Sequence, residues 1–307
     1  MAVGARRSEP TTWLAALGLA LVAAAVPAPA ARADAVLERV ARSGELRLVG
    51  PRDLPPMLSA DAKGQPQGYG AVIANRIATL VGQALGKPVR VVFDATDDGG
   101  SLSARLGEGK AELACSMPFT WARDEVVDFT HPIGVSGLRL MAPVGRFDGS
   151  PAALAGRPIA VVRQSLAETQ LRGMQPAAKV TTFANLAAAV KALQANAVDG
   201  VIGDSLLLQG QAQQLGLRGQ ALTPQTPYLR YGVVCAVPEN SSRFRSLANR
   251  AIAQLQQGYV DGNPADVAAV DRWLGPGSAL KLTPAQIRTV FDALLLGVEP
   301  LRPLASP

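Results

Sequence analysis

The sequence is poor in the residues that bind metals and in aromatic residues. It has one histidine and two cysteines among 307 residues, which is too few for the usual set of ligands at a structural zinc site. Only 5% of the residues are aromatic, and the basic residues are scattered rather than gathered in a run. These shortages exclude a zinc module and argue against a nucleic-acid partner, and we expect no cofactor.

Long apolar runs are also rare, and the clearest one lies near the start of the chain. Residues 13–26 form an apolar run that is shorter than the roughly 20 residues of a membrane-spanning helix. Arg6 and Arg7 precede it, and a small-x-small cleavage pattern follows at residues 31–33. We interpret residues 1–33 as a secretory signal peptide. The mature chain should then be soluble outside the cytoplasmic membrane, in the periplasm or otherwise exported.

Strand-like and helix-like segments alternate along the rest of the chain, and the pattern occurs twice. In the first half we expect strands at 46–49, 89–93 and 113–117 and helices at 71–85 and 102–106. In the second half we expect strands at 158–162, 180–182 and 201–203 and helices from about 166 and at 186–193. This alternation predicts an α/β fold with two similar halves and mostly parallel sheets, which bind ligands at the carboxyl ends of their strands.

A polar cluster follows the predicted strand at 113–117. Ser116, Thr120 and Arg123 supply two hydroxyl groups and a guanidinium within eight positions. A guanidinium keeps its charge and can bind a carboxylate bidentately, so we predict that Arg123 anchors a small acidic molecule. The alternative is a surface arginine paired with Asp124 or Glu125, and the spacing alone does not separate the two.

The residues around Arg123 also resemble a known family. Residues 120–123 (TWAR) and 127–133 (VDFTHPI) are similar to the T-x-x-R…V-x-F-S-x-P-Y run of the bacterial extracellular solute-binding proteins, family 3, the amino-acid type. The resemblance extends from about residue 37 to 275. Within it, the strand that begins at Tyr231 is similar to the Y-G-I-A-V strand by which these proteins return to their first lobe.

The resemblance implies a type II periplasmic-binding-protein fold, in which two lobes are joined by a two-strand hinge. Lobe 1 would comprise residues 34–137 and 233–275, and lobe 2 residues 138–232. Residues 276–307 would form an extension that the family usually lacks, with one helix beginning at Thr283-Pro284. This extension would pack on a lobe or contact a partner.

The second half supplies its own candidate ligand contacts. Gln164 and Ser165 stand where the family donates backbone N–H groups and a hydroxyl to the ligand carboxylate. The alternative is that Ser165 only caps the following helix, with Glu168 as its capping-box partner. Asp204 resembles the family aspartate that receives the ligand's amino group, and its alternative is likewise an N-cap.

Several positions depart from the family pattern. Met57 and Ile133 stand where aromatic rings are usual, and Gly70 and Gln164 replace an aspartate and a glycine. The pocket should therefore be altered. The predicted ligand-binding residues are Arg123, Thr120, Ser116, Ser165, Asp204, Met57 and Gln164.

The two cysteines, Cys115 and Cys235, would lie on neighbouring strands of the implied fold. An exported chain allows a disulfide, but only if the two Cα atoms lie about 5.5–6 Å apart. A disulfide and a pair of buried thiols therefore both remain open. His131, beside the expected cleft, is either a ligand contact or a structural residue.

The function that the resemblance implies is capture of a small carboxylate-bearing solute, an amino acid or a relative, by an exported monomer. Its partners would be the membrane subunits of an ABC importer, and it would not be an enzyme. One alternative is an orphan binding protein without a transporter, as some cyanobacterial members are, associated with a peptide system or another partner. The other is a dehydratase of the same fold, for which His131 and Glu168 are the only acid–base candidates.

Overall fold

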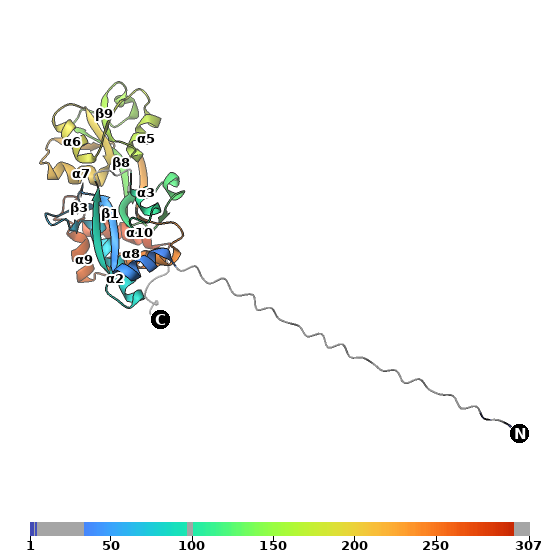
Figure 1. Ribbon diagram of the computed structural model, residues 1–307. Helices are drawn as coiled ribbons and strands as arrows, with labels where there is room; N and C mark the ends of the chain where they lie inside the picture. Colours follow the sequence, from blue (N-terminus) through green and yellow to red (C-terminus); the bar gives the residue numbers. More distant parts are fainter. Residues whose placement is uncertain (3, 5–33, 97–100, 298–307) are drawn as a thin grey trace, which may run out of the picture. The chain divides into compact units, whose positions relative to one another are not determined.

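The computed structural model describes residues 1–2, 4, 34–96 and 101–297. The predicted signal peptide lies almost entirely outside the described residues, since only residues 1, 2 and 4 of it are described. Residues 34–96 and 101–297 form one compact unit (Figure 1). No helix in the described part of the chain is long and apolar enough to cross a membrane.

Helices and strands alternate through this unit as the sequence predicts. The helices are α1 (Ala35–Ser43), α2 (Tyr69–Leu85), α3 (Leu102–Gly107), α4 (Trp121–Asp124), α5 (Leu166–Met174), α6 (Leu186–Gln194), α7 (Ser205–Gln214), α8 (Ser242–Val260), α9 (Pro264–Asp271) and α10 (Pro284–Leu295), with a 3-10 turn, η2, at Pro151–Leu154. The strands are β1 (Glu45–Pro51), β2 (Asp53–Leu54), β3 (Leu58–Ala60), β4 (Pro66–Gln67), β5 (Arg90–Thr96), β6 (Ala114–Pro118), β7 (Asp128–Phe129), β8 (Gly134–Pro143), β9 (Pro158–Val162), β10 (Lys179–Phe183), β11 (Gly200–Asp204), β12 (Gln220–Thr223) and β13 (Leu229–Val237).

The strands pair both in parallel and in antiparallel fashion. The pairs β1–β5, β9–β10 and β9–β11 are parallel, as expected for strands joined through helices. The long strands β8 and β13 pair antiparallel with each other, and β13 also pairs antiparallel with β6. They thereby join β6 to the β9–β11 group in one eight-stranded sheet. The fold is α/β, with helices flanking the sheets, which confirms the predicted fold class.

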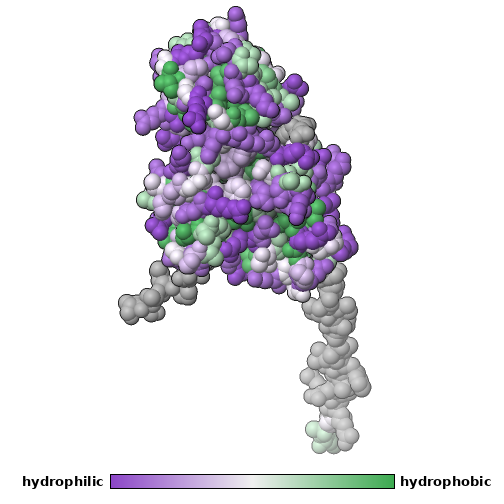
Figure 2. Space-filling model, turned by 90° about the vertical axis from the view of Figure 1, so that its left-hand side faces the viewer, coloured by the Kyte–Doolittle hydropathy of each residue, from purple (hydrophilic) through white to green (hydrophobic). Residues whose placement is uncertain are grey.

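The buried side chains form several clusters around these sheets. The largest cluster combines the apolar faces of α1, α2 and α8 with β1, and two others combine β8, β9 and β11 with α5, α6 and α7. The face of the molecule in Figure 2 is mainly hydrophilic, with apolar residues in small groups. The division into lobes at residues 34–137, 138–232 and 233–275 stays a prediction.

The C-terminal extension contains a helix that packs on the rest of the protein. Thr283 and Gln286 form a capping box at the start of α10. Ile287 and Phe291 are buried in the main core, and the Phe291 ring meets the Tyr259 ring of α8 edge-on, with their centroids 5.4 Å apart. The predicted helix is confirmed, and it packs on the body of the protein rather than projecting from it.

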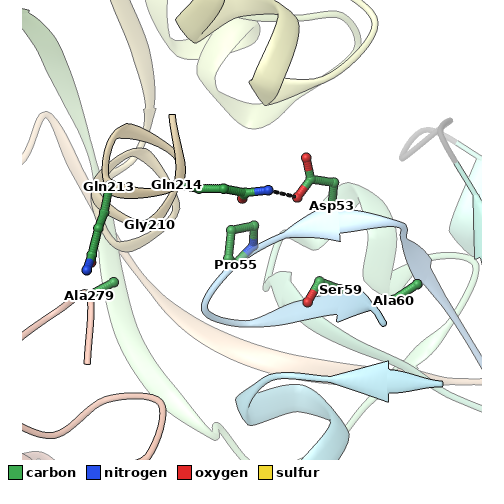
Figure 3. Close-up of a pocket in the computed structure, with 8 residues that line it drawn as sticks. All are labelled: Asp53, Pro55, Ser59, Ala60, Gly210, Gln213, Gln214 and Ala279. Atoms are coloured by element: carbon green, nitrogen blue, oxygen red, sulfur yellow. Dashed lines mark hydrogen bonds between the residues drawn. The ribbon is translucent and has the colours of Figure 1, made fainter. Parts of the chain in front are cut away.

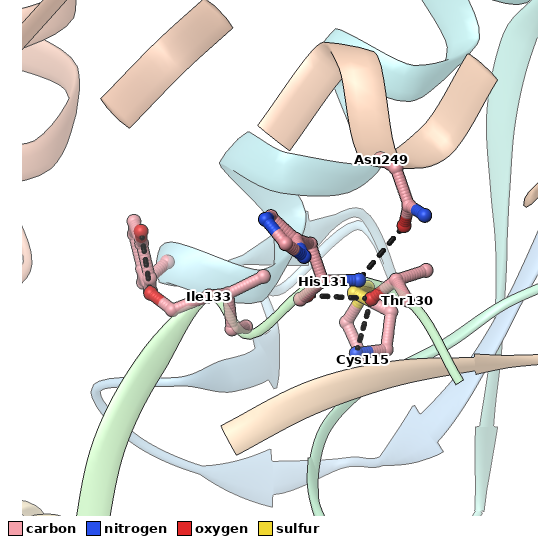
Figure 4. The surroundings of a disulfide bond; sticks show 7 residues. Cys115, Thr130, His131, Ile133 and Asn249 are labelled. Carbon is pink, nitrogen blue, oxygen red and sulfur yellow. Dashed lines mark hydrogen bonds between the residues drawn. A yellow bond between two sulfur atoms is a disulfide. The ribbon is translucent and has the colours of Figure 1, made fainter. Parts of the chain in front are cut away.

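Cys115 and Cys235 form a disulfide (Figure 4). They are direct partners on the antiparallel strands β6 and β13, and their Cα atoms are 3.9 Å apart. The expected separation of about 5.5–6 Å is therefore wrong. The backbone N–H and C=O of Cys235 bond to Thr130 instead of Cys115, and directly opposed residues that share no backbone hydrogen bond approach more closely than bonded ones.

Candidate functional site

Arg123 lies on the short helix α4 and has no counter-ion among the described residues. The Thr120 hydroxyl begins this helix by accepting a hydrogen bond from the Arg123 backbone N–H at 3.3 Å. The Arg123 Nη1 atom donates to the Pro118 carbonyl oxygen at 3.1 Å. In the described part of the chain no carboxylate lies within ion-pair distance of Arg123, so the alternative of a pair with Asp124 or Glu125 is wrong. Burial lowers the pKa of Arg123, because the charged form loses hydration.

Ser116 lies at a β-bulge beside the disulfide. Cys235 pairs with Cys115 and Val234 with Met117, so Ser116 is the extra residue of β6. Its φ angle is 71°. The Ser116 hydroxyl is buried, and no described group forms a hydrogen bond with it. Buried hydroxyl groups are usually bonded, so this unbonded hydroxyl is an exception.

Gly70 makes room for that hydroxyl. A Cβ atom at position 70 would lie 2.7 Å from the Ser116 Oγ atom and 3.0 Å from the Met57 carbonyl oxygen. Any larger side chain, including the aspartate of the family pattern, would collide with these atoms. The departure at Gly70 is therefore tied to the conformation of Ser116.

Asp204 begins helix α7 and also binds a tyrosine. Its Oδ1 atom accepts hydrogen bonds from the backbone N–H groups of Leu206 and Leu207, at 2.9 and 3.2 Å. The Tyr231 hydroxyl donates to Asp204 Oδ2 at 2.6 Å. Burial raises the pKa of Asp204, and the hydrogen bonds from Tyr231 and Ser136 oppose that shift. The N-cap alternative is thus confirmed, and the predicted ligand contact stays a prediction.

Tyr231 connects the surroundings of Asp204 with those of Arg123. It lies on β13, where the next residues, Gly232 and Val233, pair with Phe119 and Pro118 just before α4. The positive charge of Arg123 acts to lower the pKa of Tyr231, but burial and the Asp204 carboxylate raise it overall. The structure therefore brings together Arg123, Tyr231 and Asp204. Tyr231 is not among the predicted ligand-binding residues, although its place at the start of the strand similar to Y-G-I-A-V was a signal.

The start of α5 is satisfied by the protein itself. The Ser165 hydroxyl accepts a hydrogen bond from Glu168 N–H at 3.2 Å and donates to the Val162 carbonyl at 2.6 Å. The Glu168 carboxylate accepts from the Gln164 backbone N–H at 2.8 Å and pairs with Arg172 at 2.9 Å. The N-cap is confirmed, but the carboxylate bonds to residue 164 and not, as a capping box requires, to residue 165. These donors are already used within the chain.

Met57 and His131 are both held by contacts within the protein. Met57 is 4% exposed and belongs to the main core, so the structure does not place its side chain with Arg123 and Asp204. The backbone N–H of His131 donates to Asn249 Oδ1 at 2.8 Å beside the disulfide (Figure 4). Burial lowers the pKa of His131.

A cavity of about 480 Å³ lies elsewhere, between the far end of α7 and the β2–β3 turn (Figure 3). Gln211 and Gln214 of α7 donate to the Asp53 carbonyl and carboxylate there, both at 2.9 Å. The cavity is lined by Asp53, Pro55, Ser59, Ala60, Gly210, Gln213, Gln214 and Ala279, none of which the sequence predicts as a ligand contact. Within the described ranges no group of histidine, cysteine and acidic side chains could hold a metal ion.

Several solved structures are similar to this chain. An ancestral arginine-binding protein bound to glutamine is 23% identical, with a TM-score of 0.66 over 76% of this chain and 98% of its own. An ancestral amino-acid-binding protein described as a precursor of cyclohexadienyl dehydratase is 20% identical, with a TM-score of 0.67 over 78% of this chain and 99% of its own. A periplasmic binding protein of Salmonella typhimurium with high arginine specificity is 18% identical, with a TM-score of 0.63 over 75% and 99%.

These similarities show the type II periplasmic-binding-protein fold. No curated protein sequence matches the chain. The model of the bacterial extracellular solute-binding proteins, family 3, matches residues 46–262, which is well over half of the chain. The chain therefore belongs to the bacterial extracellular solute-binding proteins, family 3.

Proposed function

We propose that the protein is an exported binding protein that captures a small carboxylate-bearing solute, an amino acid or a close relative, at Arg123. The observation that carries this proposal is the partly buried Arg123 guanidinium without a carboxylate partner in the described structure. A buried charge without a partner is costly. A ligand carboxylate would compensate that cost and bind the guanidinium bidentately.

The groups near Arg123 fit the other parts of such a ligand. The free Ser116 hydroxyl would add a hydrogen bond, and Asp204 would receive an ammonium group. Thr120 would act indirectly, because its hydroxyl fixes the start of α4. We leave Gln164, Ser165 and Met57 out of the proposed site, since the first two are bonded within α5 and the third lies in the core.

Capture would involve closure of two lobes, with β8 and β13 as the hinge strands and residues 34–137 and 233–275 facing residues 138–232. A cleaved signal peptide at residues 1–33 would bring the monomeric protein to the periplasm. There it would deliver its solute to the membrane subunits of an ABC importer. The support for this part is the family, together with neighbours described as an arginine-binding protein and as the substrate-binding protein of an amino acid ABC transporter.

A thermal-shift screen of the mature protein against amino acids, small carboxylates and opines tests the proposal. A ligand at a hundred times its dissociation constant should stabilise the native state by about 2.7 kcal/mol. Arg123→Ala should lose roughly 2–5 kcal/mol of binding free energy and show no shift. Arg172→Ala is the matched control, because Arg172 already pairs with Glu168, and it should respond like the wild type. Equal ligand affinity of Arg123→Ala and wild type would refute the proposal.

The other two functions have less support. A dehydratase needs an acid–base pair, but Glu168 is held by Arg172 and Gln164, and these contacts lower its pKa. Turnover of prephenate or arogenate would favour the enzyme over the binding protein. An orphan binding protein that acts through another partner would give no thermal shift in the same screen. Circular dichroism would then have to show that the protein tested is folded.

A further inference from the structure

Two opposite charges near the proposed ligand do not pair with each other. Arg123 has no carboxylate partner in the described structure, and Asp204 binds a neutral hydroxyl group rather than a cation. Opposite charges in partly buried surroundings attract strongly unless something holds them apart. Tyr231 bonds to Asp204, and the charge of Arg123 also acts on its hydroxyl group.

Strand pairing fixes the position of Tyr231. On one side, Tyr231 pairs with Ser136 of β8, and Asp204 pairs with Leu138 of the same strand. On the other side, the residues after Tyr231 pair with Pro118, whose carbonyl holds the Arg123 side chain. Both pairings belong to one eight-stranded sheet, so backbone pairing sets the position of Tyr231 relative to Asp204 and to the end of β6 that precedes Arg123.

The Asp204 carboxylate is held at both oxygens. Two backbone N–H groups of α7 bind Oδ1, and the Tyr231 hydroxyl binds Oδ2. Without the Tyr231 hydroxyl, Asp204 would lose this hydrogen bond and keep Ser136 as its side-chain donor. The Arg123 side chain is long, has several N–H groups and has no carboxylate partner among the described residues, so we infer that it would turn toward Asp204. An internal ion pair would then occupy the guanidinium that the proposed ligand needs.

We propose that Tyr231 is a positioning residue that keeps Arg123 and Asp204 apart, so that each charge stays available to one end of a zwitterionic ligand. This inference rests on the proposed function. The hydroxyl group satisfies Asp204 without neutralising it, and a ligand ammonium can still bind a free lone pair of the carboxylate. Tyr231 therefore prevents an ion pair between Arg123 and Asp204 that would block the ligand site.

The test compares three pairs of probes that differ only in the α-ammonium: L-glutamine and glutaramate, L-arginine and 5-guanidinopentanoate, and L-glutamate and glutarate. Asp204→Asn should weaken only the amino acid of a pair. Tyr231→Phe should weaken both members at least tenfold, because Asp204 then competes for Arg123. The double variant Tyr231→Phe/Asp204→Asn should recover the affinity of Asp204→Asn for the probe without the ammonium.

Tyr228→Phe is the matched control, because no described group hydrogen-bonds the Tyr228 hydroxyl, and it should bind like the wild type in calorimetry. Unchanged binding in Tyr231→Phe, or no recovery in the double variant, would overturn the inference and leave the proposed function standing. If the folded wild type binds none of the six probes, both are overturned.

Discussion

Two places in this protein were predicted to bind a carboxylate, Arg123 and the start of α5, and they differ in what their own residues supply. Helix α5 has Glu168 in its first turn, and this carboxylate occupies the Gln164 N–H and pairs with Arg172. Helix α4 has four residues and also carries an acid, Asp124, but no described carboxylate forms an ion pair with Arg123. An acid in the first turn of a helix can satisfy the donors there. The helix without such a partner for its cation is thus the better candidate for a ligand.

Removing the disulfide between β6 and β13 is the most disruptive way to change the surroundings of Arg123. The bond joins Cys115 and Cys235 across a sequence separation of 120 residues. It thereby holds β6 against β13 beside Ser116. Disulfides that close long loops restrict the unfolded chain and typically contribute about 2–5 kcal/mol. The double variant C115A/C235A should lose that much free energy of unfolding in a urea titration.

The same titration of reduced wild-type protein is the control, and it should reproduce the loss. The start of α5 has no such cross-link, so its capping contacts should persist in the folded double variant. A midpoint that does not change on removal of both cysteines would show that β6 is held by packing alone.

Ser165 and Ser116 allow a sharper contrast, because one should affect stability and the other ligand affinity, each by about 1 kcal/mol. Ser165→Ala removes an N-cap and should cost about 1 kcal/mol of stability, with ligand affinity unchanged. Ser116→Ala removes a hydroxyl that has no described partner, so stability should stay within about 0.5 kcal/mol. Its ligand affinity should fall by about 1 kcal/mol, the net value of one hydrogen bond. Calorimetry and urea titration of both variants check this, and the reverse assignment of effects would contradict it.

Local features of the sequence predicted much of the fold and part of the site. Ser165 and Asp204 are N-caps as the alternatives foresaw, and the helix that begins at Thr283-Pro284 is present. Such features depend on a few neighbouring residues, since a cap binds N–H groups two or three positions away. The same locality explains why the alternation of strands and helices was visible.

The contacts that the sequence did not reveal depend on strand register. The bulge at Ser116 arises from how β6 pairs with β13, and Tyr231 meets Asp204 because both strands pair with β8. Met57 was placed near the ligand by resemblance, but its side chain lies in the core. A shift of register by one residue turns every side chain of a strand to the opposite face, so motif spacing alone could not place these groups.

The smallest expected effect concerns Glu168, whose carboxylate accepts a hydrogen bond at the start of α5. Contacts with Arg172 and the Gln164 N–H lower the pKa of Glu168. Because the folded pKa lies below the unfolded value, Glu168 stabilises the protein above the unfolded pKa of about 4.3, and this contribution is lost as the pH falls through the folded value. Glu168→Gln should therefore cost roughly 0.3–0.5 kcal/mol at pH 7 and less at pH 2.5. In urea titrations at both pH values, Glu38→Gln is the control, because its partner Arg42 is 3.9 Å away on an exposed face. A cost for Glu168→Gln that is equal at both pH values would show that the ionised carboxylate does not hold the start of α5, and the contrast with Arg123 would then fail.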